Sequence, residues 1–224
     1  MAQIFHPSAN SIAKASIVAS ALAIVFIIFS AVAVDRSPYV TGVTTPVPQP
    51  VPFSHEHHVG GLGIDCRFCH TSVETSSFAG IPALEICMTC HSQVWKNSPM
   101  LTPVRDGFAD PNYQTGGSPL AWARVHQLPD YAYFNHSIHI NKGVGCETCH
   151  GRVDQMPLTW KANTLHMEWC LECHRAPEKY LRPKGDIFKM GWKPPENQEE
   201  LGKRLLKENR VEKSGITDCV TCHR

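Results

Sequence analysis

The first strong feature of the chain is an uninterrupted apolar stretch near its start. Residues 15–34 contain no charged side chain; Lys14 precedes them, and Asp35 and Arg36 follow. At about 1.5 Å per residue, a helix of this length spans the ~30 Å hydrocarbon layer of a bilayer. We predict an N-terminal membrane anchor over residues 1–37 that contacts lipid through residues 15–34. The single Lys14 favours a cytoplasmic N-terminus.

A cleaved secretory signal is the alternative interpretation of the same stretch. Ala31, Val32 and Ala33 resemble a small-residue cleavage site. The apolar run is longer than the roughly 7–15 residues usual in a signal peptide, which favours an uncleaved anchor. Both interpretations export the rest of the chain.

Beyond the anchor, the pattern predicts short helices and much irregular coil. Prolines recur at alternate positions over residues 38–52, as expected of an extended linker. Residues 92–119 read as a long irregular connection. Residues 195–210 read as an exposed helix with Leu201, Leu205 and Leu206 on one face, which packs locally or docks on a partner subunit. The predicted fold class is mainly α with much irregular coil and little or no sheet.

Composition then limits the class of protein. The 224 residues carry a formal net charge of +1, so there is no basic footprint and no nucleic-acid partner is expected. Hydrophobic residues make up 42% and charged residues 18%, which argues against a disordered chain. The unusual residues are Cys and His, with 10 and 13 copies. A chain this rich in Cys, His, Pro and Gly is short of conventional core residues, so a cofactor is expected to fill the core.

Every cysteine belongs to a Cys-x-x-Cys-His unit. In this spacing two thiols form thioethers to the vinyl groups of one haem, and the following His binds the iron as its proximal ligand. We therefore predict five covalently bound c-type haems. The units are motif 1 (Cys66, Cys69, His70), motif 2 (Cys87, Cys90, His91), motif 3 (Cys146, Cys149, His150), motif 4 (Cys170, Cys173, His174) and motif 5 (Cys219, Cys222, His223).

Three other interpretations of the cysteines are weaker. Disulfides give no reason for a His after each pair. Zinc ribbons suit the spacings between motifs 1 and 2 and between motifs 3 and 4, but they leave motif 5 without a partner and again ignore five His. A thioredoxin-like redox motif occurs once per domain beside a βαβ pattern, and none is visible.

An internal repeat organises the region from residue 53 onwards. The form Phe-x-His-x-x-His occurs at Phe53 and again at Phe134, and each copy is followed by two of the five motifs. Residues 53–91 and 134–174 therefore read as two related two-haem modules, with a fifth haem at residues 219–223. The predicted pentahaem cytochrome domain covers residues 53–224.

The histidines outside the motifs supply the distal iron ligands. His spaced i, i+3 share one side of a helical turn and can serve two neighbouring haems. His57 has no counterpart in the second copy and reads as a surface or propionate-contacting residue. With every iron capped, we expect electron transfer rather than catalysis, and no catalytic residues. The predicted distal ligands are His55, His58, His136, His139 and, for the fifth iron, His126, with His166, Met167 and Met190 in reserve.

The intervening residues, as well as the motifs, resemble one family. The sequence is similar to the pentahaem cytochrome c subunit of alternative complex III, a quinol-oxidising respiratory complex. The resemblance covers about residues 53–185. Its blocks are Leu62-Gly63-Ile64-Asp65-Cys66, Ala79-Gly80-Ile81-Pro82, residues 122–139, and Trp169-Cys170-Leu171-Glu172-Cys173-His174-Arg175.

The resemblance implies a location and a set of partners. The chain would cross the bacterial cytoplasmic (inner) membrane once, with its haem domain on the periplasmic side. It would carry electrons from a polytopic quinol-binding subunit and an iron–sulfur subunit to a monohaem cytochrome c or a terminal oxidase, without being an enzyme on its own. The alternative is a membrane-anchored multihaem quinol dehydrogenase that oxidises quinol itself, and a third, weaker possibility is an anchored substrate reductase.

Overall fold

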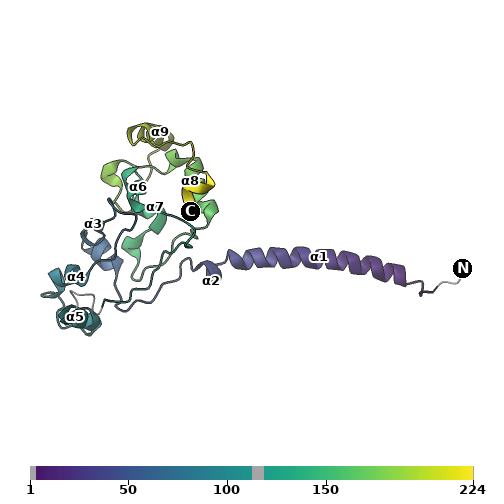
Figure 1. The fold of residues 1–224 in the computed structure, drawn as a ribbon, viewed down its shortest axis with the longest axis horizontal. Helices are drawn as coiled ribbons and strands as arrows, with labels where there is room; N and C mark the ends of the chain where they lie inside the picture. Colours follow the sequence, from purple (N-terminus) through teal and green to yellow (C-terminus); the bar gives the residue numbers. More distant parts are fainter. Residues whose placement is uncertain (1–3, 113–118, 224) are drawn as a thin grey trace. The chain divides into compact units, whose positions relative to one another are not determined.

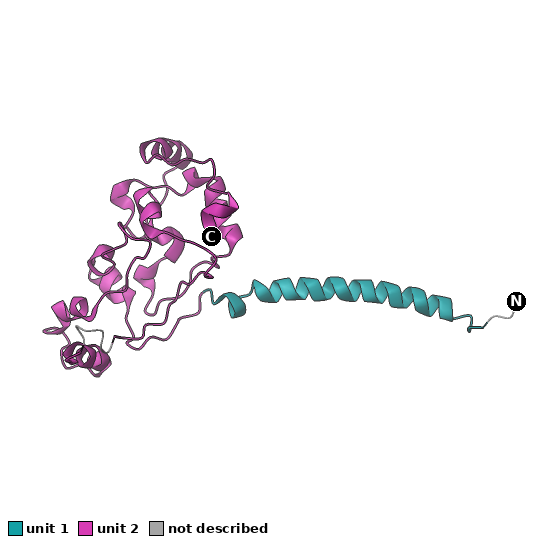
Figure 2. Ribbon diagram, viewed as in Figure 1, with its two compact units in different colours: residues 1–43 teal, residues 44–224 magenta. Residues whose placement is uncertain are grey.

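The computed structural model describes residues 4–112 and 119–223, and these divide into two compact units, residues 1–43 and 44–224 (Figure 2). In the first unit, helix α1 (Ala9–Asp35) contains the apolar stretch and extends beyond it at both ends. It is 27 residues long, and none of its residues is buried. The helix is long and apolar enough to cross a membrane.

A short turn of helix ends the first unit. Helix α2 (Pro38–Thr41) begins at a proline, which suits the first helical turn because no backbone N–H is needed there. It stops at Gly42, whose φ of 66° lies in the left-handed region that glycine adopts without strain.

The second unit consists of short helices joined by irregular chain, with α4 and α5 at one end and α9 at the other (Figure 1). Among the described residues there is no sheet, and strand-like pairing occurs at isolated bridges such as Ala132–His223 and Val144–Leu181. The predicted fold class is confirmed. The elements are η1 (Glu56–Gly61), α3 (Cys66–Cys69), α4 (Leu84–His91), η2 (Pro99–Leu101), α5 (Thr102–Ala109), α6 (His136–Asn141), α7 (Cys146–His150), η4 (Val153–Gln155), α8 (Met167–Arg175), η5 (Pro177–Lys179), η6 (Lys184–Asp186), α9 (Gln198–Glu208) and α10 (Cys219–Cys222).

The proline-rich segment from residue 44 lies along the second unit. The backbone N–H groups of Thr44 and Val47 donate to the carbonyl oxygens of Lys161 and Thr159, at 2.8 and 3.2 Å. The side chain of Gln49 makes two hydrogen bonds of 2.9 Å with the backbone of residue 123. These hydrogen bonds to neighbouring segments hold the extended chain in place.

One predicted connection contains a helix. Residues 92–119 were expected to be irregular, but η2 and α5 occupy residues 99–109. Leu101 and Val104 from these elements pack with Val51 and Leu84 in one of the two small apolar clusters. Pro103 in the first turn fixes φ for the helix, and tertiary packing stabilises a segment too short to be helical alone. Residues 113–118 of the expected connection lie outside the described residues.

The predicted amphipathic helix is confirmed as α9, and its apolar face packs locally. Leu205 is buried, and the helix lies against η5. The closest approach is at Gly202, where an added Cβ would meet the backbone carbonyl of Glu178. Only glycine allows the helix to come this close.

We expect Gly202→Ala to destabilise the second unit by about 2 kcal/mol. The added methyl group has to displace backbone rather than a flexible side chain, and this cost exceeds the ~1 kcal/mol gain in helix propensity. Denaturant unfolding monitored by circular dichroism measures the change. Gly185→Ala is the matched control because its added Cβ would meet no atom within 4 Å. Equal stability of the two variants would contradict the prediction.

Candidate functional site

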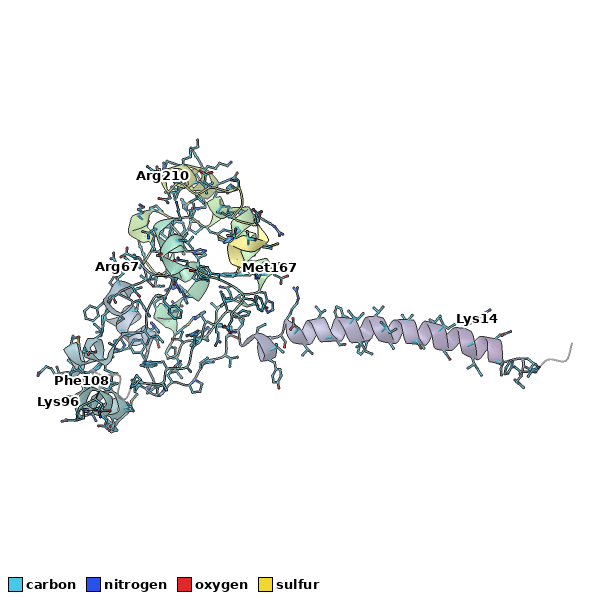
Figure 3. The ribbon with its side chains drawn as sticks, in the orientation of Figure 1. Lys14, Arg67, Lys96, Phe108, Met167 and Arg210 are labelled. Atoms are coloured by element: carbon cyan, nitrogen blue, oxygen red, sulfur yellow. The ribbon has the colours of Figure 1, made fainter. Side chains whose placement is uncertain are left out.

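Each of the five motifs lies on a short helix or at its end. Helices α3, α4, α7, α8 and α10 carry motifs 1 to 5 in that order. Two cysteines at i and i+3 on one helical turn project to the same side, as two bonds to one planar group require. At motif 1 the carboxylate of Asp65 caps the helix by accepting a 2.8 Å hydrogen bond from the N–H of Arg67. The Arg67 guanidinium, labelled in Figure 3, pairs with the same carboxylate at 2.9 Å.

The histidines of four motifs are oriented in the same way. In each, Nδ1 lies within hydrogen-bond distance of a backbone carbonyl oxygen, which can only accept, so Nδ1 carries the proton. The lone pair then sits on Nε2, the atom that a proximal ligand offers to a metal. The carbonyl partners are Gly80 for His70 (2.7 Å), Val94 for His91 (3.0 Å), Ile216 for His174 (2.7 Å) and Tyr131 for His223 (3.1 Å).

The Phe-x-His-x-x-His repeat has nearly identical geometry in its two copies. Phe53 contacts the ring of His55 edge-on, with centroids 4.9 Å apart, and stacks on His58 at 4.5 Å. Phe134 does the same with His136 at 4.8 Å and with His139 at 4.4 Å. A single phenyl ring thus positions two imidazoles in each copy.

Hydrogen bonds complete the match between the copies. His58 Nδ1 donates to Ser54 O at 2.8 Å, and His139 Nδ1 donates to Asn135 O at 2.7 Å. Both carbonyls lie four residues before the His. In both cases Nε2 is directed away from its own helix and is available as a ligand.

Three pairs of rings have the separation that one bis-histidine iron requires. An imidazole nitrogen binds a first-row metal at about 2.0 Å, so two imidazoles on opposite sides of one metal have centroids roughly 6.3 Å apart. The observed separations are 6.2 Å for His58 and His91, 6.3 Å for His136 and His150, and 6.2 Å for His139 and His174. The residues present therefore fit a metal held between each pair.

The pairs follow one rule. In the second module, the first His of the repeat faces the first motif and the second His faces the second motif. In the first module, His58 likewise faces His91 of the second motif. The pKa of His55 is lowered mainly by burial and further by His70 of the first motif, so the two rings lie close to each other.

His126, the fifth predicted distal ligand, lies beside motif 3. Its ring is 4.3 Å from that of His150 in motif 3, and its Nε2 is buried without a hydrogen-bond partner. A buried nitrogen without a partner costs free energy, so it marks a position suited to a ligand. At motif 5, the ring near His223 is Tyr131, with centroids 5.8 Å apart.

The other candidates are more exposed. The Met167 side chain is 60% exposed at the start of α8, three residues before Cys170, and is labelled in Figure 3. His166 is the N-cap residue of the same helix. His57 is exposed, with its ring 6.3 Å from that of Trp95, in agreement with its prediction as a surface residue.

Burial keeps the rings of His55, His126 and His150 neutral. It lowers the pKa of His55 and of His126 to about 4 and that of His150 to about 3, and neighbouring histidines add to each shift. A neutral imidazole has a lone pair to donate, whereas an imidazolium has none. At pH 7 these rings are therefore in the form that binds metal.

The spatial order of the motifs differs from their order in the chain. Motif 1 lies beside motif 2, because the thiols of Cys87 and Cys90 contribute to the raised pKa of Cys69, after burial. Motif 1 also lies beside motif 3, because the thiol of Cys66 is close enough to that of Cys146 to raise the pKa of Cys146, together with burial. The apolar cluster of Val73, Ile140 and Ile187, against which Cys146 packs, joins the same two regions. Motif 1 is therefore between motifs 2 and 3.

The remaining motifs continue in the same direction. Burial raises the pKa of Cys149 to about 12, with smaller contributions from Cys173 and Cys170 of motif 4. Motif 4 lies beside motif 5, because the thiol of Cys222 contributes to the raised pKa of Cys170, after burial. The ring of His174 in motif 4 is also hydrogen-bonded to the carbonyl oxygen of Ile216, three residues before motif 5. The spatial order is thus 2, 1, 3, 4, 5.

The arrangement does not favour the zinc alternative. In the described ranges 4–112 and 119–223, no three His, Cys, Asp or Glu side chains converge on one point as ligands of a single ion. Instead, the cysteines lie in pairs within their motifs, and three pairs of histidine rings lie at the separation that a single metal between them would require.

Comparison with known proteins agrees with this chemistry. Residues 132–224 match the family model described as cytochrome c7 and related cytochrome c. The chain is also similar to the multihaem cytochrome c subunit of menaquinone reductase from Nitratidesulfovibrio vulgaris, with 34% identity over 132 residues. That match covers 59% of this chain and 57% of the relative.

Proposed function

From the cytochrome c7 match over residues 132–224 and the paired imidazoles, we propose that this chain is the electron-transfer subunit of a quinone-linked membrane complex. Five c-type haems, each held by two thioethers and one motif His, would supply one-electron redox chemistry. The single observation that carries the proposal is the bis-imidazole separation, found at motifs 2, 3 and 4.

The protein's own residues bind and orient these groups. The motif cysteines fix each group covalently, so that little protein is needed around it. The backbone carbonyls hold the proximal rings, and Phe53 and Phe134 hold the distal rings. At motifs 2, 3 and 4 the paired imidazoles would leave no position on the metal for a substrate, which favours electron transfer over catalysis.

Two directions of electron flow fit this arrangement. The resemblance to alternative complex III favours a quinol-oxidising complex, in which a polytopic subunit and an iron–sulfur subunit deliver electrons and a cytochrome c or a terminal oxidase receives them. The menaquinone reductase relative favours the opposite direction, from a cytochrome towards quinone. The chain spans just over half of that relative's length, so the relative's activity is carried over as a proposal only.

We also propose that α1 anchors the chain in the cytoplasmic membrane, with the second unit on the periplasmic side. The evidence is the apolar helix itself, which is long enough to span the bilayer. Periplasmic exposure suits the thioether chemistry and the quinone-linked partners. The isolated chain would then have no quinol-oxidising activity.

Haem content tests the proposal directly. We expect the purified, acetone-extracted and denatured polypeptide to retain five haems per chain in the pyridine haemochrome assay, because thioethers survive extraction whereas axial ligation does not. Replacing Cys219 and Cys222 by Ala reduces the content to four. A denatured chain without haem absorbance would refute covalent attachment. Quinol oxidation by the isolated chain would instead support the dehydrogenase alternative.

A further inference from the structure

A buried arginine lies against motif 3 without a role in the sites described above. Arg182 is only 4% exposed, and its Nε is buried without a hydrogen-bond partner. The pKa of arginine is so high that the side chain keeps its charge even where burial lowers that pKa. An arginine is almost never fully buried unless something compensates its charge.

The backbone fixes this side chain over the start of α7. The N–H of Arg182 donates to Gly143 O at 2.9 Å, and the adjacent residue Leu181 pairs with Val144. The guanidinium occupies the space in front of Gly145, where an added Cβ would collide with it. Gly145 directly precedes Cys146, so the charge lies at the thioether side of motif 3.

Its polar contacts are long and incomplete. One terminal nitrogen reaches carbonyl oxygens of residues 186 and 189 at 3.5 and 3.3 Å, and the other reaches the Thr148 hydroxyl at 3.3 Å. The Glu147 carboxylate is 4.0 Å away, and the Trp192 ring stacks at 4.6 Å. Glu147 and Thr148 are the two middle residues of motif 3. The positive charge of Arg182 therefore lies next to motif 3 in a position with little access to water.

We infer that Arg182 sets the reduction potential of the haem held at motif 3, and that Glu147 opposes it. The inference rests on the proposed function, because it requires a haem at Cys146 and Cys149. One-electron reduction, with the electron supplied by the electrode, adds one negative charge to that haem. A fixed cation nearby stabilises the reduced form, and a fixed anion destabilises it. Low local polarity strengthens both effects.

The test is a spectroelectrochemical titration of the full haem-loaded chain carrying Arg182→Met. We expect the ratio of reduced to oxidised motif 3 haem at a fixed potential to fall about tenfold, equivalent to ~59 mV for a one-electron couple. Glu147→Gln shifts the ratio in the opposite direction. Arg182→Lys, which keeps the charge, restores most of the original value. The Cys146→Ala, Cys149→Ala variant identifies which of the five waves belongs to motif 3.

Opposite signs distinguish an electrostatic role from a structural one. If Arg182 only holds the chain against motif 3, Arg182→Met and Glu147→Gln shift the wave in the same direction or not at all, and the inference is overturned. If Arg182→Met does not fold, the double variant with Glu147→Gln is compared with Glu147→Gln alone; we expect the double variant to have the lower potential, and equal potentials would overturn the inference. If the haem content does not change when Cys146 and Cys149 are removed, the proposed function itself fails.

Discussion

An electron injected next to motif 2 should be trapped there when motif 1 loses its haem. Motif 1 lies between motif 2 and the rest of the motifs, with Cys69 near the thiols of motif 2 and Cys66 near Cys146 of motif 3. Replacing Cys66 and Cys69 by Ala removes this connection. In the unmodified chain we expect the electron to spread over all five haems, whereas in the variant it remains on one.

A light-activated ruthenium complex attached at residue 96 measures this. Lys96 is exposed, is five residues beyond His91 and is labelled in Figure 3. In the haem-loaded protein, Lys96→Cys would provide the only free thiol, because the proposed function places all ten native cysteines in thioethers. Transient absorption then follows the electron after a laser flash.

The matched control removes the terminal motif instead. The Cys219→Ala, Cys222→Ala variant also has four haems, but motifs 2, 1, 3 and 4 remain contiguous, so the electron spreads over four. Trapping in this control, or free spreading when motif 1 is removed, would contradict the spatial order deduced above. If the haems were instead arranged in the order of the motifs along the chain, motif 1 would be at one end, and its removal would leave the electron free to spread from motif 2 over the other haems.

The second large effect is expected at His139. Its ring stacks on Phe134 and lies 6.2 Å from that of His174 in motif 4. Replacing His139 by Ala removes one of the two imidazoles and leaves an open position on that iron. We expect the reduced variant to bind one equivalent of carbon monoxide more than the unmodified protein, and added imidazole to compete with it.

His57→Ala is the control for this prediction. His57 lies in the equivalent repeat of the first module, but it is exposed and has no counterpart in the second copy. Its removal should leave carbon monoxide binding unchanged. Equal binding by the two variants, or no additional binding by His139→Ala, would show that His139 is not an axial ligand.

Local patterns in the sequence were sufficient for α1, for α9 and for the internal repeat. The apolar run predicted α1, and leucine spacing predicted α9, because both signals are periodic and local. The Phe-x-His-x-x-His repeat predicted equivalent geometry, and the two copies agree within 0.1 Å in each pair of ring separations. The family-model match and the relative support a multihaem cytochrome c.

Contacts between segments far apart in the sequence could not be predicted from these local patterns. Helix α5 forms because Val104 packs against Val51 and Leu84, and neither contact is visible from residues 92–119 alone. The repeat does not include His126, and its place beside His150 of motif 3 depends on the fold. Arg182 carried no signal at all, since it lies outside every motif and acquires its position only when residues 181–192 pack against α7.

The closeness of the Cys66 and Cys146 thiols, each of which shifts the pKa of the other, has a consequence for how such a protein is made. In an oxidising compartment, two thiols this close are able to form a disulfide, which would link motifs 1 and 3 and block both from receiving haem. If the unit folded before attachment, this side reaction would compete with maturation. If the chain is exported and carries haem as proposed, its biogenesis requires that the polypeptide be kept reduced and that haem reach the cysteines before the chain closes around them.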